Sequence, residues 1–263
     1  MEDVLALGNL RFRYKLEGHG PWLVLLHGVG GSLEQWDAFI EALGGRYRTL
    51  RFDQRGRGQS SKPPGPYSNE DFVADLKGMV DAVIDPEESF ALVGNSLGAI
   101  VAQGFALVYP DRLSKLVLLA GVAGRTEAEK AAVAKRLAVV EGGVAGAHFE
   151  QSMDRWFTDT FREANPDTIA YWAERNRAND PQGYAAAYYV LANTDLIDRL
   201  HEIVIPTLIA TGEEDRGSNP RMSRAMHECI KGSRLHIFPG LRHQLLIEAP
   251  EAVAGLVDGF LRS

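Results

Sequence analysis

The chain places a serine, an aspartate and a histidine after three predicted strands, and these side chains together could carry out nucleophilic catalysis. They are Ser96, Asp215 and His243. A serine hydroxyl is a weak nucleophile until a histidine accepts its proton, and a carboxylate holds that histidine in the required tautomer. Because the three residues lie far apart in the sequence, the chemistry requires a fold that brings the ends of their strands together.

Ser96 lies in the sequence Gly94-Asn95-Ser96-Leu97-Gly98, between a predicted strand and a predicted helix. The apolar residues 90–93 indicate a buried strand, and the small apolar residues after Gly98 indicate a buried helix. A sharp turn between the two would expose the hydroxyl, and a side chain at position 94 or 98 would clash with a neighbouring element. The start of the helix would also direct N–H groups at a developing oxyanion.

Asp215 and His243 follow later strands, so the order along the chain is serine, acid, histidine. Asp215 comes last in Gly212-Glu213-Glu214-Asp215, and we favour it over Glu213 and Glu214 because the acid must reach beyond the strand end. A free imidazole has a pKa of about 6.5, so His243 could take the Ser96 proton and pass it to a leaving group. We expect His27 to order its glycine loop, and we assign no catalytic role to the other histidines, which are His19, His148, His201, His227 and His236.

Two backbone N–H groups would complete the site as an oxyanion hole. Leu97, the residue after the nucleophile, would supply one, and we assign the other to Val29, in the glycine loop after the apolar run Trp22–Leu26. A second polar glycine loop, residues 53–60, contains Arg55 and Arg57. We expect these arginines to hold the loop in place, because polar glycine loops usually have structural roles.

Strand-like and helix-like segments alternate at both ends of the chain, which predicts an α/β fold with a mostly parallel sheet flanked by helices. Residues 5–16 indicate a hairpin around Gly8-Asn9, and Ser32 and Asn69 are predicted helix N-caps. The other predicted strands are Trp22–Leu26, 48–53, 90–93, 116–120, 205–212 and Arg234–Phe238. Later helices are predicted over 222–230 and Pro250–Leu261.

The strand pattern disappears between residues 122 and 196, where long helical segments replace it. We therefore predict an α/β core formed by residues 1–121 and 197–263, with residues 122–196 inserted as a helical cap. Aromatic residues are frequent in this segment, and we expect most of them to pack the cap against the core. Trp156 is the one that we propose as a substrate contact, because small-molecule pockets favour aromatic walls. The group comprises Trp156, Phe157, Phe161, Tyr171, Trp172, Tyr184, Tyr188 and Tyr189.

Composition excludes several classes of protein. The net charge is −7 and no basic stripe appears, which argues against a nucleic-acid partner. No apolar run approaches the length of a membrane span, and the first residues lack the apolar region of a signal peptide. The lone cysteine, Cys229, cannot form a disulfide within the chain. We expect a soluble cytoplasmic protein without a membrane partner, and the sequence leaves its oligomeric state open.

Together these motifs resemble the α/β-hydrolase superfamily over almost the full length of the chain. The matching residues are His27-Gly28, the loop from Asp53 to Ser60, Gly94-Asn95-Ser96-Leu97-Gly98, Gly212 with Asp215, and His243. The resemblance implies that Ser96 is the nucleophile, Asp215 the acid and His243 the base, with Val29 and Leu97 as the oxyanion hole. It also implies an enzyme that uses neither a metal nor another cofactor.

Within that superfamily, the chain looks most like 3-oxoadipate enol-lactonases and small carboxylesterases. Its length and the segment Arg155-Trp156-Phe157-Thr158 are similar to theirs. We therefore expect hydrolysis of a small carboxylic ester or enol-lactone through an acyl-enzyme on Ser96. One alternative is a C–C bond hydrolase of a meta-cleavage-type dienoate, although Gly30-Gly31-Ser32 and Gln244 depart from that group's pattern. Another is a small-ligand-binding module without catalysis.

Overall fold

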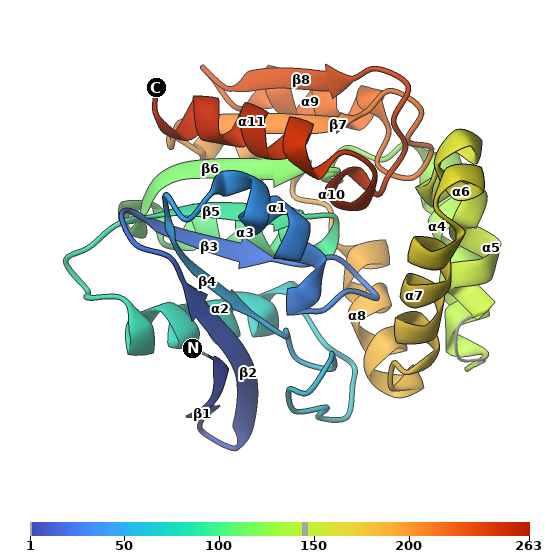
Figure 1. Ribbon diagram of the computed structural model, residues 1–263, viewed down its shortest axis with the longest axis horizontal. Helices are drawn as coiled ribbons and strands as arrows, with labels where there is room; N and C mark the ends of the chain where they lie inside the picture. Colours follow the sequence, from blue (N-terminus) through green and yellow to red (C-terminus); the bar gives the residue numbers. More distant parts are fainter. Residues whose placement is uncertain (1, 144–146) are drawn as a thin grey trace.

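A computed structural model describes residues 2–143 and 147–263, and it contains a central sheet with helices on both faces (Figure 1). The eight strands have the order β1-β2-β4-β3-β5-β6-β7-β8. The hairpin β1–β2 is antiparallel and β2 pairs antiparallel with β4, whereas all other neighbours are parallel. The predicted α/β class is therefore confirmed. The strands are β1 (Glu2–Leu7), β2 (Leu10–Glu17), β3 (Trp22–Leu26), β4 (Arg48–Phe52), β5 (Phe90–Asn95), β6 (Leu113–Leu119), β7 (Thr207–Gly212) and β8 (Arg234–Phe238).

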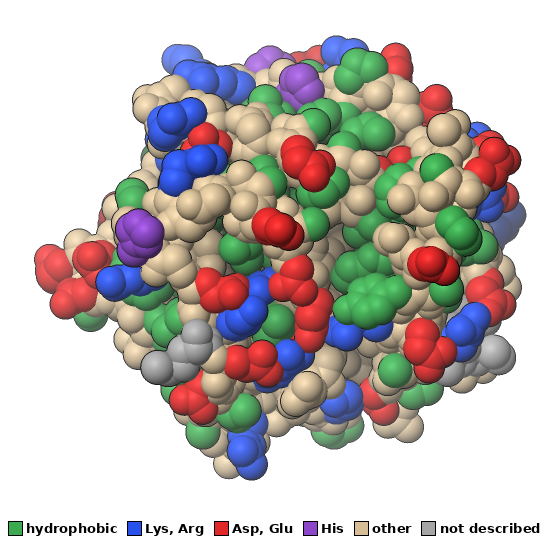
Figure 2. Space-filling view, viewed as in Figure 1, with side chains coloured by type: hydrophobic (Ala, Val, Ile, Leu, Met, Phe, Trp, Pro, Cys, Tyr) green, Lys and Arg blue, Asp and Glu red, His purple; other side chains and the backbone are tan. Residues whose placement is uncertain are grey.

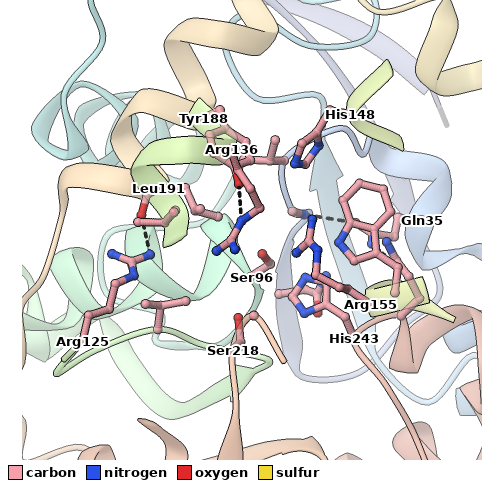
Figure 3. A pocket seen from close by; sticks show the side chains of 18 residues that line it. Gln35, Ser96, Arg125, Arg136, His148, Arg155, Tyr188, Leu191, Ser218 and His243 are labelled. Atoms are coloured by element: carbon pink, nitrogen blue, oxygen red, sulfur yellow. Dashed lines mark hydrogen bonds between the residues drawn. The ribbon is translucent and has the colours of Figure 1, made fainter. Parts of the chain in front are cut away.

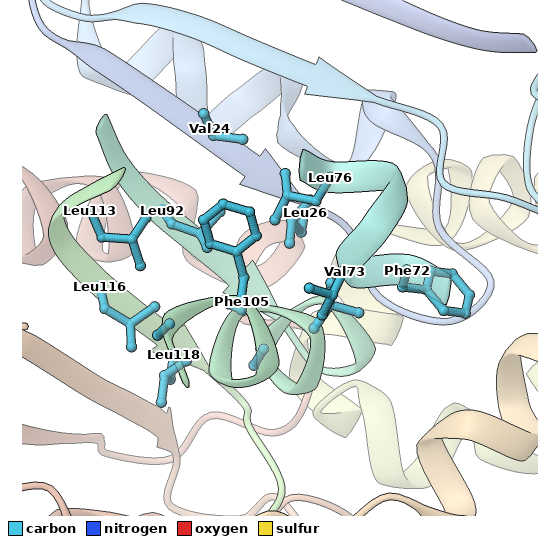
Figure 4. Close-up of a cluster of buried hydrophobic side chains, with 14 of the residues drawn as sticks. Val24, Leu26, Phe72, Val73, Leu76, Leu92, Phe105, Leu113, Leu116 and Leu118 are labelled. Carbon is cyan, nitrogen blue, oxygen red and sulfur yellow. The ribbon is translucent and has the colours of Figure 1, made fainter. Parts of the chain in front are cut away.

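Helices bury an apolar layer on each face of the sheet. On one face, α1 (Asp37–Leu43) and α11 (Pro250–Leu261) pack over Val93 of β5. On the other face lie α2 (Asn69–Val83), α3 (Leu97–Val108) and α9 (Pro220–Cys229), and Figure 4 shows Leu76 and Phe105 from two of these helices beside Leu92. Because adjacent residues of β5 face opposite layers, residues 90–93 of the strand are all apolar. Each such leucine or phenylalanine stabilises the fold by about 2–3 kcal/mol.

In the described part of the chain, five helices follow β6 and form a separate group, which we call the cap helices. Figure 1 shows them beside the carboxyl ends of the parallel strands. The division of the chain into two domains stays a prediction. It assigns residues 1–121 and 197–263 to the core and residues 122–196 to the cap. The cap helices are α4 (Glu127–Glu141), α5 (Ala147–Trp156), α6 (Asp159–Ala164), α7 (Pro166–Arg177) and α8 (Pro181–Asn193). The shorter helices elsewhere are η1 (Leu33–Trp36), η2 (Pro110–Arg112), η3 (Ile197–Glu202) and α10 (Leu245–Glu248).

One of the two predicted N-caps occupies the expected position without making a capping bond, and the other lies one residue from the observed cap. Ser32 is at the N-cap position of η1, but its hydroxyl donates to Glu34 instead of accepting a backbone N–H, and Asp53 accepts the Leu33 N–H at 2.8 Å. The helix predicted to begin after Asn69 instead has Ser68 as its N-cap, with a capping box to the third helical residue. Both Ser and Asn are favoured N-caps, so adjacent candidates cannot be separated by residue type alone.

The cap aromatics pack with one another and also against the core, where Trp156 stacks with His243 and Arg57 lies over the ring of Tyr184. Trp156 and Phe157 join Phe149 in one cluster of buried side chains, and Tyr184 and Tyr188 form another with valines of α4. These helices therefore have small apolar interiors of their own. Tyr171 and Tyr189 are exposed.

Acidic and basic side chains are intermixed over the face of the molecule shown in Figure 2. None of the helices in the described part of the chain is long and apolar enough to cross a membrane.

Candidate active site

Ser96 occupies a tight turn between β5 and α3. Its backbone angles are φ 55° and ψ −112°, an unfavourable conformation for a residue with a side chain. A Cβ added to Gly94 would lie 2.2 Å from the oxygen of Gly98, and one added to Gly98 would lie 2.2 Å from the oxygen of Leu26. The Ser96 N–H donates to the oxygen of Leu119 at 2.9 Å. Close backbone packing thus holds the strained turn in place.

Asp215 and His243 are in direct contact. Oδ2 of Asp215 lies 2.6 Å from Nδ1 of His243, and Oδ1 accepts the N–H groups of Gly217 and Ser218 at 2.7 and 2.9 Å. Burial alone would raise the pKa of this carboxyl, but the charge and hydrogen bond of His243 and the two backbone bonds outweigh it, so the pKa is lowered. Asp215 is therefore an ionised carboxylate that leaves Nε2 of His243 available on the other side of the ring.

The two neighbouring carboxylates interact elsewhere. Glu213 accepts the N–H of Gly240 at 3.0 Å, and Glu214 pairs with Arg242 at 3.3 Å. In the described structure, Asp215 is the acid of this loop that contacts His243.

The glycine loop after β3 is held by hydrogen bonds with two other segments. The amide oxygen of Gln35 accepts the Gly28 N–H at 3.0 Å, and Nε2 of His27 accepts the Gln54 N–H at 3.0 Å. His27 is 1% exposed, and burial lowers its pKa to about 4, so the ring is neutral. This arrangement is consistent with the ordering role predicted for His27.

Val29 follows in the same loop and lines the pocket, while Leu97 is the first residue of α3. The N–H groups in the first turn of a helix have no acceptor within the helix, so the Leu97 N–H has no intrahelical partner. The oxyanion hole at Val29 and Leu97 stays a prediction.

Ser96 and His243 face a pocket between the core and the cap helices (Figure 3). Trp156 also lines it and stacks with His243, with ring centroids 6.4 Å apart and planes inclined by 25°. The lining residues are Gly28, Val29, Gln35, Asn95, Ser96, Val122, Arg125, Val133, Arg136, His148, Arg155, Trp156, Tyr188, Leu191, Gly217, Ser218, His243 and Gln244.

Three lining residues on α4 and α5 were not singled out from the sequence: Arg136, His148 and Arg155. Nδ1 of His148 lies 2.7 Å from the Tyr184 hydroxyl, and burial, with help from both arginines, lowers the pKa of His148 to about 3. His148 is therefore a neutral wall residue of the pocket, a position that its lack of an assigned catalytic role did not predict. For Arg155, the available signal was its place in the segment Arg155-Trp156-Phe157-Thr158, which is similar to a segment of enol-lactonases.

Of the two loop arginines that were expected to hold their loop in place, Arg55 does so and Arg57 does not. Arg55 holds its loop through two hydrogen bonds to Asp75, at 2.6 and 2.8 Å. Arg57 is 1% exposed and lies over the ring of Tyr184 at 4.8 Å, and none of its side-chain nitrogens has a hydrogen-bond partner among the described residues. Burial lowers its pKa to about 10. Arg57 thus contacts a cap helix through the face of an aromatic ring instead of tying its own loop.

No group of three or more His, Cys, Asp or Glu side chains in the described ranges could hold a metal ion.

A family model described as the alpha/beta hydrolase fold matches residues 21–250. The chain belongs to this family. The α/β hydrolase is 29% identical over 268 residues to the (E)-2-((N-methylformamido)methylene)succinate hydrolase of Acinetobacter baylyi, covering 100% of this chain and 99% of that one. It is 26% identical to 3-oxoadipate enol-lactonase 2 of the same organism, covering 99% and 97%.

Among solved structures, the enol-lactonase from Burkholderia xenovorans LB400 superposes on this α/β hydrolase with a TM-score of 0.91. The two chains are 26% identical, and the match covers 99% of this chain and 100% of the other. The predicted resemblance to the enol-lactonase and esterase group is confirmed.

Proposed function

We propose that this α/β hydrolase cleaves a small carboxylic ester or lactone through an acyl-enzyme on Ser96. The contact between Asp215 and His243, in the pocket that also contains the strained Ser96 turn, is the observation that carries the proposal. The resemblance to enol-lactonases supports a cyclic or linear ester as the bond that is cleaved.

In the first half of the proposed reaction, Nε2 of His243 removes the proton of Ser96 as its oxygen attacks the substrate carbonyl. The N–H groups of Leu97 and Val29 stabilise the negative charge that develops on the carbonyl oxygen. Asp215 stabilises the imidazolium, which then protonates the departing oxygen. The C–O bond breaks and leaves the acyl group on Ser96.

In the second half, His243 removes a proton from water, which attacks the acyl carbonyl. The tetrahedral intermediate collapses, Ser96 regains its proton from His243, and the free acid departs. No cofactor is needed in either half, because water is the only co-reactant.

A fluorophosphonate probe combined with a substrate panel tests the proposal. The probe should label the wild type and the Ser114→Ala control, an exposed serine on β6, and it should not label Ser96→Ala. Turnover of aryl esters, enol-lactones or N-acyl lactones should fall by about 10⁴–10⁶ in Ser96→Ala.

Two results would contradict the proposal. Turnover of a 2-hydroxy-6-oxo dienoate without turnover of any ester would instead support C–C bond hydrolysis by the same three residues. An unlabelled wild type that is also inactive on the whole panel would support a ligand-binding module.

A further inference from the structure

The charged side chains that line the pocket all have the same sign. Arg125, Arg136 and Arg155 belong to the lining, and no aspartate or glutamate does. This is unexpected for a chain of net charge −7. Cations withdrawn from water are costly unless they are paired, so each arginine needs a physical explanation.

Arg125 is already satisfied by the backbone. Its guanidinium donates to the oxygens of Leu191, Ala192 and Thr194, at 2.6, 3.3 and 3.3 Å. These carbonyls lie at the C-terminal end of α8, where a helix favours a nearby cation. Arg125 therefore fastens the end of this helix.

Arg136 and Arg155 have unused donors. Arg136 makes one hydrogen bond, from Nε to the Tyr188 hydroxyl at 3.2 Å, and Arg155 makes one to the hydroxyl of Ser152. Neither forms an ion pair with any carboxylate within residues 2–143 and 147–263. Asp215 is close enough to act on the charge of Arg155, but its oxygens are occupied by His243 and two backbone N–H groups.

The positive charges of Arg136 and Arg155 lie close enough to repel one another. Burial, followed by the positive charge of Arg136, lowers the pKa of Arg155. The nearby His148 adds no third charge because its own pKa is lowered to about 3. An anion between the arginines would relieve their repulsion and take up their free N–H groups.

Figure 3 shows both guanidinium groups directed into the space that Ser96 and His243 face. They come from α4 and α5, whereas the serine and histidine come from the sheet core. The arginines, Ser96 and His243 therefore line one shared pocket.

We propose that Arg136 and Arg155 form a subsite for a carboxylate that the substrate carries in addition to its reacting ester or lactone. The inference rests on the proposed function and narrows its substrate to small esters or lactones of dicarboxylic or hydroxydicarboxylic acids. A planar guanidinium matches a carboxylate through paired N–H donors, so the subsite recognises geometry as well as charge.

Matched esters test the subsite. In the first pair, the 4-nitrophenyl monoester of adipic acid, whose free carboxylate is in the acyl half, is compared with the same ester in which that carboxylate is capped as a methyl ester. In the second pair, 4-carboxyphenyl butyrate, whose carboxylate is in the alcohol half, is compared with its methyl-capped counterpart. The wild type should prefer the anionic member of at least one pair by about 10–100-fold in kcat/KM, the range expected for a charged hydrogen bond.

Arg136→Gln and Arg155→Gln should each remove most of that preference, measured as the ratio of kcat/KM for the anionic ester to kcat/KM for its capped counterpart. Arg→Lys at either position should restore part of it, because the charge returns without the planar fork. The control is Arg177→Gln, a half-exposed arginine of α7 paired with Glu150 and Glu174. It should keep the wild-type preference.

A binding measurement separates this inference from the proposed function. Adipate should raise the Tm of the wild type and of Ser96→Ala, adipamide should not, and the shift should disappear in both arginine variants. An adipate shift in a protein that the fluorophosphonate probe does not label would support the subsite and contradict the hydrolase mechanism. A labelled, active enzyme with equal kcat/KM for anionic and capped esters and no adipate shift would overturn the subsite alone.

Discussion

Nδ1 of His243 lies 2.6 Å from Oδ2 of Asp215, while the other oxygen of that carboxylate is held by two backbone N–H groups. The carboxylate is therefore fixed from both sides and cannot rotate away from the imidazole. Because Nδ1 is occupied by this contact, Nε2 is the ring nitrogen that remains available to accept a proton from Ser96.

Asp215→Asn tests the importance of that fixed charge. An amide can force the imidazole into the wrong tautomer and cannot stabilise the imidazolium, so kcat should fall by about 10³–10⁴. Glu214→Gln is the matched control, since its carboxylate pairs with Arg242 instead. Steady-state kinetics on one ester would contradict this role if the two variants lost activity equally.

Gly98→Ala tests the close packing at the turn. The new Cβ would lie 2.2 Å from the Leu26 oxygen, so the turn must distort, and we expect a loss of at least about 100-fold in kcat/KM together with a lower Tm. Gly255→Ala is the control, because nothing lies within 4 Å of its added Cβ and the residue is exposed in α11. This control should stabilise the protein by about 0.5–1 kcal/mol. An alanine at 98 with wild-type Tm and activity would disprove the packing constraint.

Trp156→Ala removes the ring that stacks on His243 and lines the pocket. We expect kcat/KM to fall by about 2–10-fold, the value of one aromatic stacking contact, with Trp156→Phe nearer to the wild type. Tyr171→Ala, at an exposed aromatic of α7, should have no effect. Unchanged kcat and KM for every substrate of the panel would remove Trp156 as a substrate contact.

Two buried neutral histidines should make the protein less stable in mild acid. The pKa values of His27 and His148 are lowered to about 4 and about 3, mainly by burial, whereas in the unfolded chain each is about 6.5. Between these limits the unfolded chain binds protons that the folded protein does not, so stability is complete above about pH 6.5 and declines as the pH falls. The expected loss is about 2 kcal/mol for each histidine between pH 7 and pH 5.

Urea unfolding at both pH values measures this loss. His148→Gln should reduce the pH-dependent part by the share of one histidine, and His19→Gln, at an exposed position, should not. A wild type with the same free energy of unfolding at pH 5 and pH 7 would show that these rings are not held neutral.

The core could be predicted from the sequence because its signals are local. The bounds of β3 and α11 agree with the apolar patterns that predicted them, since strands buried on both faces and helices packed on a sheet need continuous or periodic apolar residues. The turn at Ser96 was equally recognisable, because close backbone contact requires the two glycines around it.

The pocket walls could not be predicted in the same way. Arg136 lies on a helix with two buried residues, Val133 and Val140, so its sequence resembles any solvated helix. Only the packing of α4 beside α8 turns this arginine toward Ser96. Arg155 and His148 depend on tertiary contacts of the same kind, and a pattern within one helix does not encode them.

The strands that precede and follow the cap helices, β6 and β7, are neighbours in the sheet. The intervening helices are therefore a side branch of the topology, and lengthening or exchanging them leaves the strand order and the Ser96 turn intact. Replacement of that branch would accordingly change the pocket wall formed by Arg136, His148 and Arg155, while Ser96, Asp215 and His243 keep their places on the core.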